Sequence, residues 1–228
     1  MLVIFLILFG IRSGFMEYSG YEQKYQNDKI TIYQADCMKM LPQIPDKYYQ
    51  LCIVDPPYGI NIAKEKPRVS GRWNYTPRKW DEIIPDKVYF SELNRVSENQ
   101  IIWGGNYFNL PATRCMVIWD KQQPVENFAD CEIAWTSFNQ VARIFRMSFA
   151  ANKFKIHITQ KPVALYQWLL KNYAKPGDKI LDTHGGSCSI AIACDIMGFD
   201  ADIYEIDEDY YKAAVERFER HKQQAKLE

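Results

Sequence analysis

The stretch from residue 179 to residue 205 constrains the fold more than any other part of the chain. It predicts a short buried strand, a tight turn with two adjacent glycines, an apolar helix and a second strand, over residues 179–182, 183–187, 190–197 and 201–204. Gly198 is the expected C-cap of the helix. Two neighbouring strands joined through a helix run parallel, because the helix carries the chain back across the sheet. The stretch therefore predicts an α/β domain.

The rest of the chain continues this alternation of strands and helices. Strands are expected over residues 29–33, 51–54, 100–103 and 115–119, and helices over 37–41, over 88–96, from 162 onward and near the C-terminus. Two further strands, 131–137 and 141–147, are expected to form a hairpin around residues 138–140. The predicted fold is a Rossmann-like, mostly parallel twisted sheet with helices on both faces and an antiparallel hairpin at one edge.

Length and composition indicate one domain. The chain has 228 residues, 47% of them hydrophobic and 25% charged, which allows a sizeable core within residues 16–228. Residues 1–15 form an apolar extension that is too short to span a bilayer and lacks the basic start of a secretory signal. This extension is either dispensable or packed on the domain or a partner. Six cysteines without paired spacing and three histidines predict reduced thiols, no metal site and a cytoplasmic location without membrane contact.

The tetrapeptide Asp55-Pro56-Pro57-Tyr58 follows the expected strand 51–54 directly. Neither proline has an N–H to donate to a neighbouring strand, so the strand must stop at Asp55. A carboxylate, backbone carbonyls and an aromatic ring are thereby placed at the C-terminal edge of a sheet, where ligands bind in α/β folds. The alternative is a proline-stiffened turn with a solvated aspartate.

The glycine turn has the features of a nucleoside site. Gly185 and Gly186 allow a ligand to approach the backbone at the start of a helix. Glu205 ends the next strand, where an acidic side chain usually binds ribose hydroxyls. The spacing G-x-G-x-x-G is missing, so the turn is not the one that binds a dinucleotide pyrophosphate.

Two stretches are locally basic, although the formal net charge is +0. The first, over residues 59–80, interleaves Trp73, Tyr75 and Trp80 with the cations Lys64, Lys66, Arg68, Arg72, Arg78 and Lys79. Cations for phosphates and aromatic rings for stacking suit a nucleic-acid loop, and a solvated insertion is the alternative. The second stretch, over 143–161, includes Arg143 and Arg146 and is either a second DNA-facing surface or a strand edge protected by charge.

Three motifs together resemble those of a known family. Asp55-Pro56-Pro57-Tyr58 is similar to the catalytic motif of amino-methylating DNA methyltransferases. The run from His157 to Pro162, HITQKP, resembles the family's H-P-T-Q-K-P, and the run from Asp182 to Ser189, DTHGGSCS, resembles D-P-F-x-G-S-G-T. The order of these motifs is that of the β-group, whose fold is a circular permutation of the common methyltransferase fold. The resemblance covers the chain from about residue 29 to its end.

The resemblance implies an enzyme that moves a methyl group from S-adenosylmethionine to an exocyclic amine of DNA. Asp55 and the Pro56 carbonyl would accept the two amine hydrogens, and Tyr58 would stack on a base flipped out of the duplex. The residues implied at the cofactor are Asp36 near the adenine, Glu205 at the ribose, and Thr159, Lys161, Asp182 and Gly186 around the methionine portion. The other expected cofactor-binding residues are His184, Gly185 and Ser187. Double-stranded DNA is the implied partner, and the family also allows a homodimer and a cognate restriction enzyme.

The glycine motif departs from the family pattern at several positions. Thr183 and His184 replace Pro and Phe, Ile158 replaces a Pro, and Cys188 replaces a Gly. His184 is expected to form a wall over the cofactor, with a solvent-pointing turn histidine as the alternative. The Cβ of Cys188 causes no strain in place of the glycine if φ at that position is negative, so cofactor binding need not fail.

Asp55 favours adenine N6 as the target, because relatives that methylate cytosine N4 commonly have Ser at that position. The alternatives are an N4-cytosine enzyme, an enzyme of this fold acting on RNA or a protein amide, and a non-catalytic nucleotide- or DNA-binding module. A dehydrogenase-like protein is a further alternative, but it would have only the arrangement of the glycine turn in common with this chain. Residues that read a DNA sequence would lie in the least patterned segments, so no recognition site is predicted.

Overall fold

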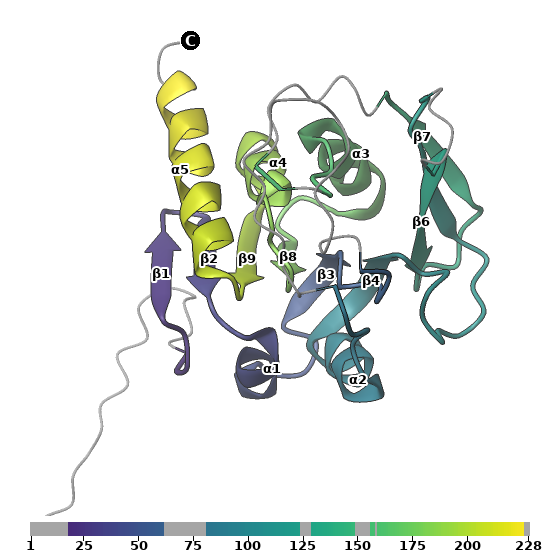
Figure 1. Ribbon diagram of the computed structural model, residues 1–228, viewed down its shortest axis with the longest axis horizontal. Helices are drawn as coiled ribbons and strands as arrows, with labels where there is room; N and C mark the ends of the chain where they lie inside the picture. The colour runs from purple at the N-terminus through teal and green to yellow at the C-terminus, as the bar shows by residue number, and fades with distance from the viewer. Residues whose placement is uncertain (1–17, 62–80, 124–128, 149–155, 158, 226–228) are drawn as a thin grey trace, which may run out of the picture.

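The computed structural model describes residues 18–61, 81–123, 129–148, 156–157 and 159–225, and they form one sheet flanked by helices (Figure 1). The nine strands of the sheet lie in the order β1-β2-β9-β8-β3-β4-β6-β5-β7. Their bounds are β1 Gln23–Gln26, β2 Ile30–Gln34, β3 Tyr49–Val54, β4 Ser97–Trp103, β5 Met116–Asp120, β6 Cys131–Thr136, β7 Arg143–Arg146, β8 Lys179–Asp182 and β9 Asp200–Glu205. The helices are α1 Cys37–Met40, the 3-10 turn η1 Leu41–Gln43, α2 Lys87–Val96, α3 Val163–Tyr173, α4 Ser189–Met197 and α5 Glu208–Gln224.

The centre of the sheet is parallel, as the sequence predicts. Strand β2 pairs with β9, β9 with β8, β8 with β3 and β3 with β4, all in the same direction. Cys52 of β3 lies beside Leu181 of β8, so the two strands end at the same edge of the sheet. The register therefore brings Asp55 and the glycine turn after Asp182 to one place, although they are far apart in the sequence.

Both faces of the sheet are buried, which explains the uninterrupted apolar run in β3. Leu51 and Ile53 belong to the core beneath α3, α4 and α5. Cys52 and Val54 face the opposite core, which α1 and α2 cover. Figure 1 shows these two helix layers on either side of the central strands. A strand that is covered on both faces has no polar side to expose, so it does not alternate.

The helices begin and end at residues whose chemistry sets those boundaries. Asp86 accepts hydrogen bonds from two backbone amides in the first turn of α2, and Asp207 does the same for α5. Asp36 caps α1 by accepting from the Met38 amide. Gly198 ends α4 with a φ of +79°, as expected for a C-cap glycine. No helix in the described residues is long and apolar enough to cross a membrane.

The expected hairpin between strands 131–137 and 141–147 is wrong. Strand β6 pairs antiparallel with β4 on one side and with β5 on the other, so neither of its edges is left for β7. The chain instead passes over β5, and β7 pairs with it in parallel, from Val117 with Arg143 to Asp120 with Arg146. The antiparallel pairs at this end of the sheet are therefore β4 with β6 and β6 with β5. A third antiparallel pair, β1 with β2, forms the opposite edge and was not expected.

Candidate active site

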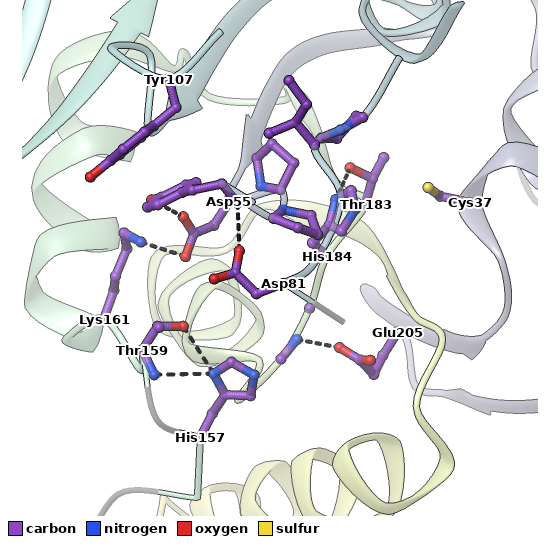
Figure 2. Close-up of a pocket in the computed structure, with 18 of the residues that line it drawn as sticks. Cys37, Asp55, Asp81, Tyr107, His157, Thr159, Lys161, Thr183, His184 and Glu205 are labelled. Carbon is purple, nitrogen blue, oxygen red and sulfur yellow. Dashed lines mark hydrogen bonds and ion pairs between the residues drawn. The ribbon is translucent and has the colours of Figure 1, made fainter. Parts of the chain in front are cut away.

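A cavity of about 930 Å³ opens at the C-terminal edge of the parallel strands (Figure 2). Predicted site residues from five separate parts of the chain line it: Asp36, Asp55, Pro56, Pro57, Tyr58, Thr159, Lys161, His184, Gly185, Gly186, Ser187 and Glu205. Asp182 does not line it; its carboxylate lies behind the turn and accepts a hydrogen bond from the His184 amide at 3.0 Å. The cavity has the size of a site for a small-molecule ligand.

The carboxylate of Asp55 has a donor on each oxygen. The Tyr58 hydroxyl donates to Oδ1, and the buried Lys161 ammonium pairs with Oδ2. Removal from water raises the pKa of Asp55, and the Lys161 charge opposes that rise. The arrangement holds one carboxylate in a fixed orientation at the cavity wall, beside the two prolines that end β3.

The turn that carries Tyr58 is tied to Asp81. The amides of Tyr58 and Gly59 both donate to Asp81 Oδ1, at 2.7 and 3.0 Å. The Tyr58 ring stacks on Tyr107, with centroids 4.9 Å apart and planes 14° apart. Gly104 lies against the same ring, and a Cβ at Gly104 would come within 2.2 Å of it. Tyr58 is thus fixed by its hydroxyl, its amide and its ring.

Glu205 binds the glycine turn directly. Its Oε2 accepts from the Gly186 amide at 2.6 Å, and its Oε1 accepts from the Asp207 amide at 2.8 Å. Burial raises the pKa of Glu205 to about 7 and that of Asp182 to about 8. These two carboxyl groups therefore take up a proton at a higher pH than surface carboxylates do.

Cys188 has a φ of +49°, so the condition under which its Cβ would cause no strain is not met. The turn closes through a 2.7 Å hydrogen bond from the Cys188 amide to the Gly185 carbonyl, and α4 starts at the next residue. This geometry puts Cys188 in the left-handed region that favours glycine. Gly185 cannot carry a side chain, since its Cβ would lie 2.6 Å from Ile203.

His184 lines the cavity and does not point to solvent. Its Nδ1 lies 2.9 Å from the Thr183 hydroxyl and 3.4 Å from the Tyr89 hydroxyl, and its ring meets the Tyr89 ring edge to face. Burial lowers the pKa of His184 to about 4, so the imidazole is neutral at pH 7. The Thr183 that replaces proline supplies one of its partners.

His157, the first residue of the HITQKP run, closes the other side of the glycine turn. Its Nδ1 accepts from the Thr159 amide at 3.3 Å and lies 3.1 Å from the Thr159 hydroxyl. Its ring contacts Tyr210 at a centroid distance of 4.4 Å and covers Gly186, whose Cβ would meet it at 3.5 Å. Burial lowers the pKa of His157 to about 3. A small ligand at this turn would lie between neutral rings.

Several residues of the site were not predicted from the sequence. Among those not expected here are Asp81, Tyr107, Lys121, Glu132 and His157, all of which line the cavity. His157 lies in a motif and could have been found; the others reach the site through turns or strand pairing. The cations Lys64, Lys66, Arg68, Arg72, Arg78 and Lys79 lie outside the described residues. Arg143 and Arg146 are exposed on β7, the terminal strand of the sheet, and do not line the cavity.

Comparison with known proteins gives a consistent result. A family model described as "DNA methylase" matches residues 118–216. The chain is 24% identical to the type II methyltransferase M.HinfI of Haemophilus influenzae over an alignment of 242 residues, which covers 82% of this chain and 67% of that protein. Both matches include the segment that carries the glycine turn.

Solved structures share the fold at low sequence identity. The complex of M1.HpyAVI with SAM has a TM-score of 0.57 and 18% identity, covering 82% of this chain and 99% of the other. The cytosine-N4-specific PvuII DNA methyltransferase has a TM-score of 0.60 and 15% identity, with 87% and 90% covered. The family match, the sheet order and the three motifs gathered at one cavity agree with one another, and all make the chain similar to DNA methyltransferases.

Proposed function

We propose that this protein transfers a methyl group from S-adenosylmethionine to N6 of adenine in double-stranded DNA. One observation carries the proposal: Asp55, presented by two prolines at the end of β3, shares a single cavity with the glycine turn and Glu205. A transferase needs its donor site and its acceptor site to open into each other. A proline-stiffened turn with a solvated aspartate has no need to share a cavity with the glycine turn.

The cofactor half of the cavity suits a nucleoside that carries an amino acid. Glu205 would accept from ribose hydroxyls, Asp36 would lie near the adenine, and Thr159 and the turn residues His184 to Ser187 would surround the methionine portion. The bare backbone at Gly186 leaves room beneath His157 for close approach. When bound, S-adenosylmethionine supplies the methyl group as an electrophile. A SAM complex of a protein with this fold supports the assignment.

The Asp55 side of the cavity suits an exocyclic amine. The lone pair of such a nitrogen is delocalised into the base until acceptors hold its two hydrogens. Asp55 and the Pro56 carbonyl would accept them, which orients the lone pair and stabilises the positive charge that develops on the nitrogen. Asp55 also faces the proton that the nitrogen must lose once the new N–C bond has formed.

The target base would have to leave the duplex to reach this depth. The cations of the segment 59–80 are proposed to contact phosphates beside the flipped base, with Arg143 and Arg146 as a second contact region. Asp55, in place of the serine common in cytosine-N4 relatives, favours adenine as the target.

Product analysis tests the proposal. The protein would be incubated with methyl-labelled S-adenosylmethionine and double-stranded DNA from a methylation-deficient host, and the DNA digested to nucleosides for chromatography. Label in N6-methyladenine is the expected result, and Asp55→Ala is the negative control. Label in N4-methylcytosine would show that the target is cytosine and not adenine. Absence of labelled DNA would contradict DNA methylation altogether.

A further inference from the structure

Four charged side chains of alternating sign, beginning with Asp55, form a continuous row. Lys161 Nζ pairs with Asp55 Oδ2 and lies 3.0 Å from Glu132 Oε2. Glu132 Oε1 lies 2.7 Å from Lys121 Nζ. Glu132 comes from β6 and Lys121 follows β5 directly, so the antiparallel strand pair is joined to the catalytic motif through Lys161.

Lys161 is enclosed by these partners. Its side chain is 1% exposed, and its ammonium lies 5.1 Å from the centre of the Trp103 ring, which is fully buried. A buried ammonium is stabilised only by groups that replace its water, and here the replacement consists of two carboxylates and a ring face. If Glu132 lost its charge, Asp55 would be the only carboxylate left within ion-pair distance of Lys161 among the described residues.

We propose that Glu132 is a positioning residue for methyl transfer, which holds the Lys161 ammonium in place and thereby fixes the orientation and charge of the Asp55 carboxylate. The proposal rests on the proposed function, because it assigns Asp55 to the target amine. Glu132 itself would touch neither the base nor the cofactor. Methyl transfer slows when the carboxylate that must accept an N–H in one direction is free to rotate. Small displacements of such groups lower the reaction rate by about 10²-fold.

The electrostatics give the proposal a specific signature. The negative charge of Glu132 raises the pKa of both Asp55 and Lys161, and Lys161 in turn lowers the pKa of Asp55. The other ionisable groups that face this row are Tyr58, His157, Tyr166 and Asp182. Glu132→Gln leaves all of these in place and removes one charge.

The pH profile of kcat should therefore shift in one direction at both ends. With Glu132 neutral, Asp55 ionises more readily, so the acid limb moves to lower pH. Lys161 loses a carboxylate that favours its charged form, so the alkaline limb also moves to lower pH. Substitution of a residue that only supports the fold would change the amount of active protein and leave both limbs of the pH profile at their wild-type positions.

The test compares Glu132→Gln and Glu132→Asp with the control Asp130→Asn, an exposed carboxylate two residues earlier that does not line the cavity. We expect Glu132→Gln to lower kcat by up to about 10²-fold, with both pH limbs displaced downward and the calorimetric Kd for S-adenosylmethionine unchanged. Glu132→Asp, which keeps the charge but shortens the side chain, should lower kcat less and leave the limbs near their wild-type positions. Asp130→Asn should match the wild type.

Two results would overturn the proposal: a wild-type kcat and pH profile in Glu132→Gln, or a loss of kcat that accompanies weaker cofactor binding with unmoved limbs. If Glu132→Gln does not fold, Glu132→Asp tests the proposal in its place. A wild-type kcat in Glu132→Asp would contradict a positioning role for Glu132, because the shortened side chain cannot hold Lys161 in the same place. Failure of the proposed function is seen separately, because the wild-type protein would then label no DNA before any variant is compared. Product on cytosine instead of adenine leaves the Glu132 test intact.

Discussion

Tyr107 lies flat against Tyr58, with the ring centroids 4.9 Å apart and the planes inclined by only 14°. Tyr107 is 44% exposed, whereas Tyr58 is held by Asp55 and Asp81 beneath it. The ring proposed to stack on a flipped base therefore already has an aromatic partner within the protein. A base that stacks on this face of Tyr58 must take the place of Tyr107.

Replacing Tyr107 by alanine should therefore make base flipping more favourable. An aromatic pair contributes about 0.5–1.5 kcal/mol, and this is the cost of separating the two rings. Binding of DNA that carries 2-aminopurine at the target position reports flipping by its fluorescence, which should rise at lower protein concentration for Tyr107→Ala. Tyr107→Phe keeps the stack and should match the wild type. Weaker flipping in Tyr107→Ala would show that Tyr107 itself holds the base.

Asp55→Ala should abolish methyl transfer and leave cofactor binding nearly intact. Asp55 contacts Tyr58 and Lys161 and makes no described hydrogen bond to the glycine turn. Loss of a preorganised group of this kind costs about 10²–10³ in rate. Single-turnover assays give the rate, and calorimetry gives the Kd for S-adenosylmethionine. Near-wild-type turnover in Asp55→Ala would contradict its assignment to the target amine.

Glu205→Gln should weaken S-adenosylmethionine binding and remove part of its pH dependence. Hydrogen bonds to a charged group are each worth about 1.5–3 kcal/mol, so affinity should fall about 10- to 100-fold. Because the pKa of Glu205 is raised to about 7, the wild-type carboxyl takes up a proton as the pH falls through 7. The hydroxyls of a ribose favour the ionised form, so wild-type affinity should decrease on the acid side of that value.

Calorimetry on either side of pH 7 measures this effect, with Glu208→Gln as the control. Glu208 is an exposed carboxylate on α5, three residues after Glu205, and lies outside the cavity. It should keep the wild-type affinity and pH dependence. An unchanged affinity in Glu205→Gln would remove Glu205 from the cofactor site.

Cys188→Gly should be more stable than Cys188→Ala. At ordinary helical positions alanine is the better residue, but a left-handed conformation costs a residue with a Cβ about 1–2 kcal/mol. Both variants lose the buried thiol, so that loss cancels in the comparison. Urea denaturation should place the glycine variant about 1 kcal/mol above the alanine variant. The reverse order would mean that the turn relaxes when the thiol is removed.

The two basic stretches can be separated by the salt dependence of DNA binding. Each lost phosphate contact should reduce the slope of log affinity against log salt by about 0.9. We expect the double variant Arg72→Ala/Arg78→Ala to bind DNA with a shallower slope and unchanged cofactor affinity. Arg143→Ala/Arg146→Ala is the matched comparison, also with two charges removed. If only this second pair changes the slope, the DNA surface lies at β7.

The sequence predicts those parts of the site that depend on local chemistry. Two prolines end β3 wherever it lies in the sheet, because they have no N–H to donate. The turn after β8 is likewise set by its own glycines and does not depend on the position of β8 in the sheet. Glu132 could not be found in this way, because its contact with Lys161 depends on β6 lying beside β4. The same non-local pairing made the expected hairpin wrong, since neighbouring strands in the sequence suggest a hairpin even when a third strand separates them. The sign of φ at Cys188 stayed open in the sequence, because closure of the turn decides it.

The sheet order also has a consequence for how the protein is made. Strands β8 and β9 lie between β2 and β3, although both are synthesised well after β3. During translation, Asp55 and Tyr58 therefore leave the ribosome long before the strands that must lie beside β3. A growing chain cannot complete the middle of its sheet, and contacts of such long sequence separation form slowly. Nascent chains should stay catalytically silent until release, with unpaired strand edges that a chaperone could recognise.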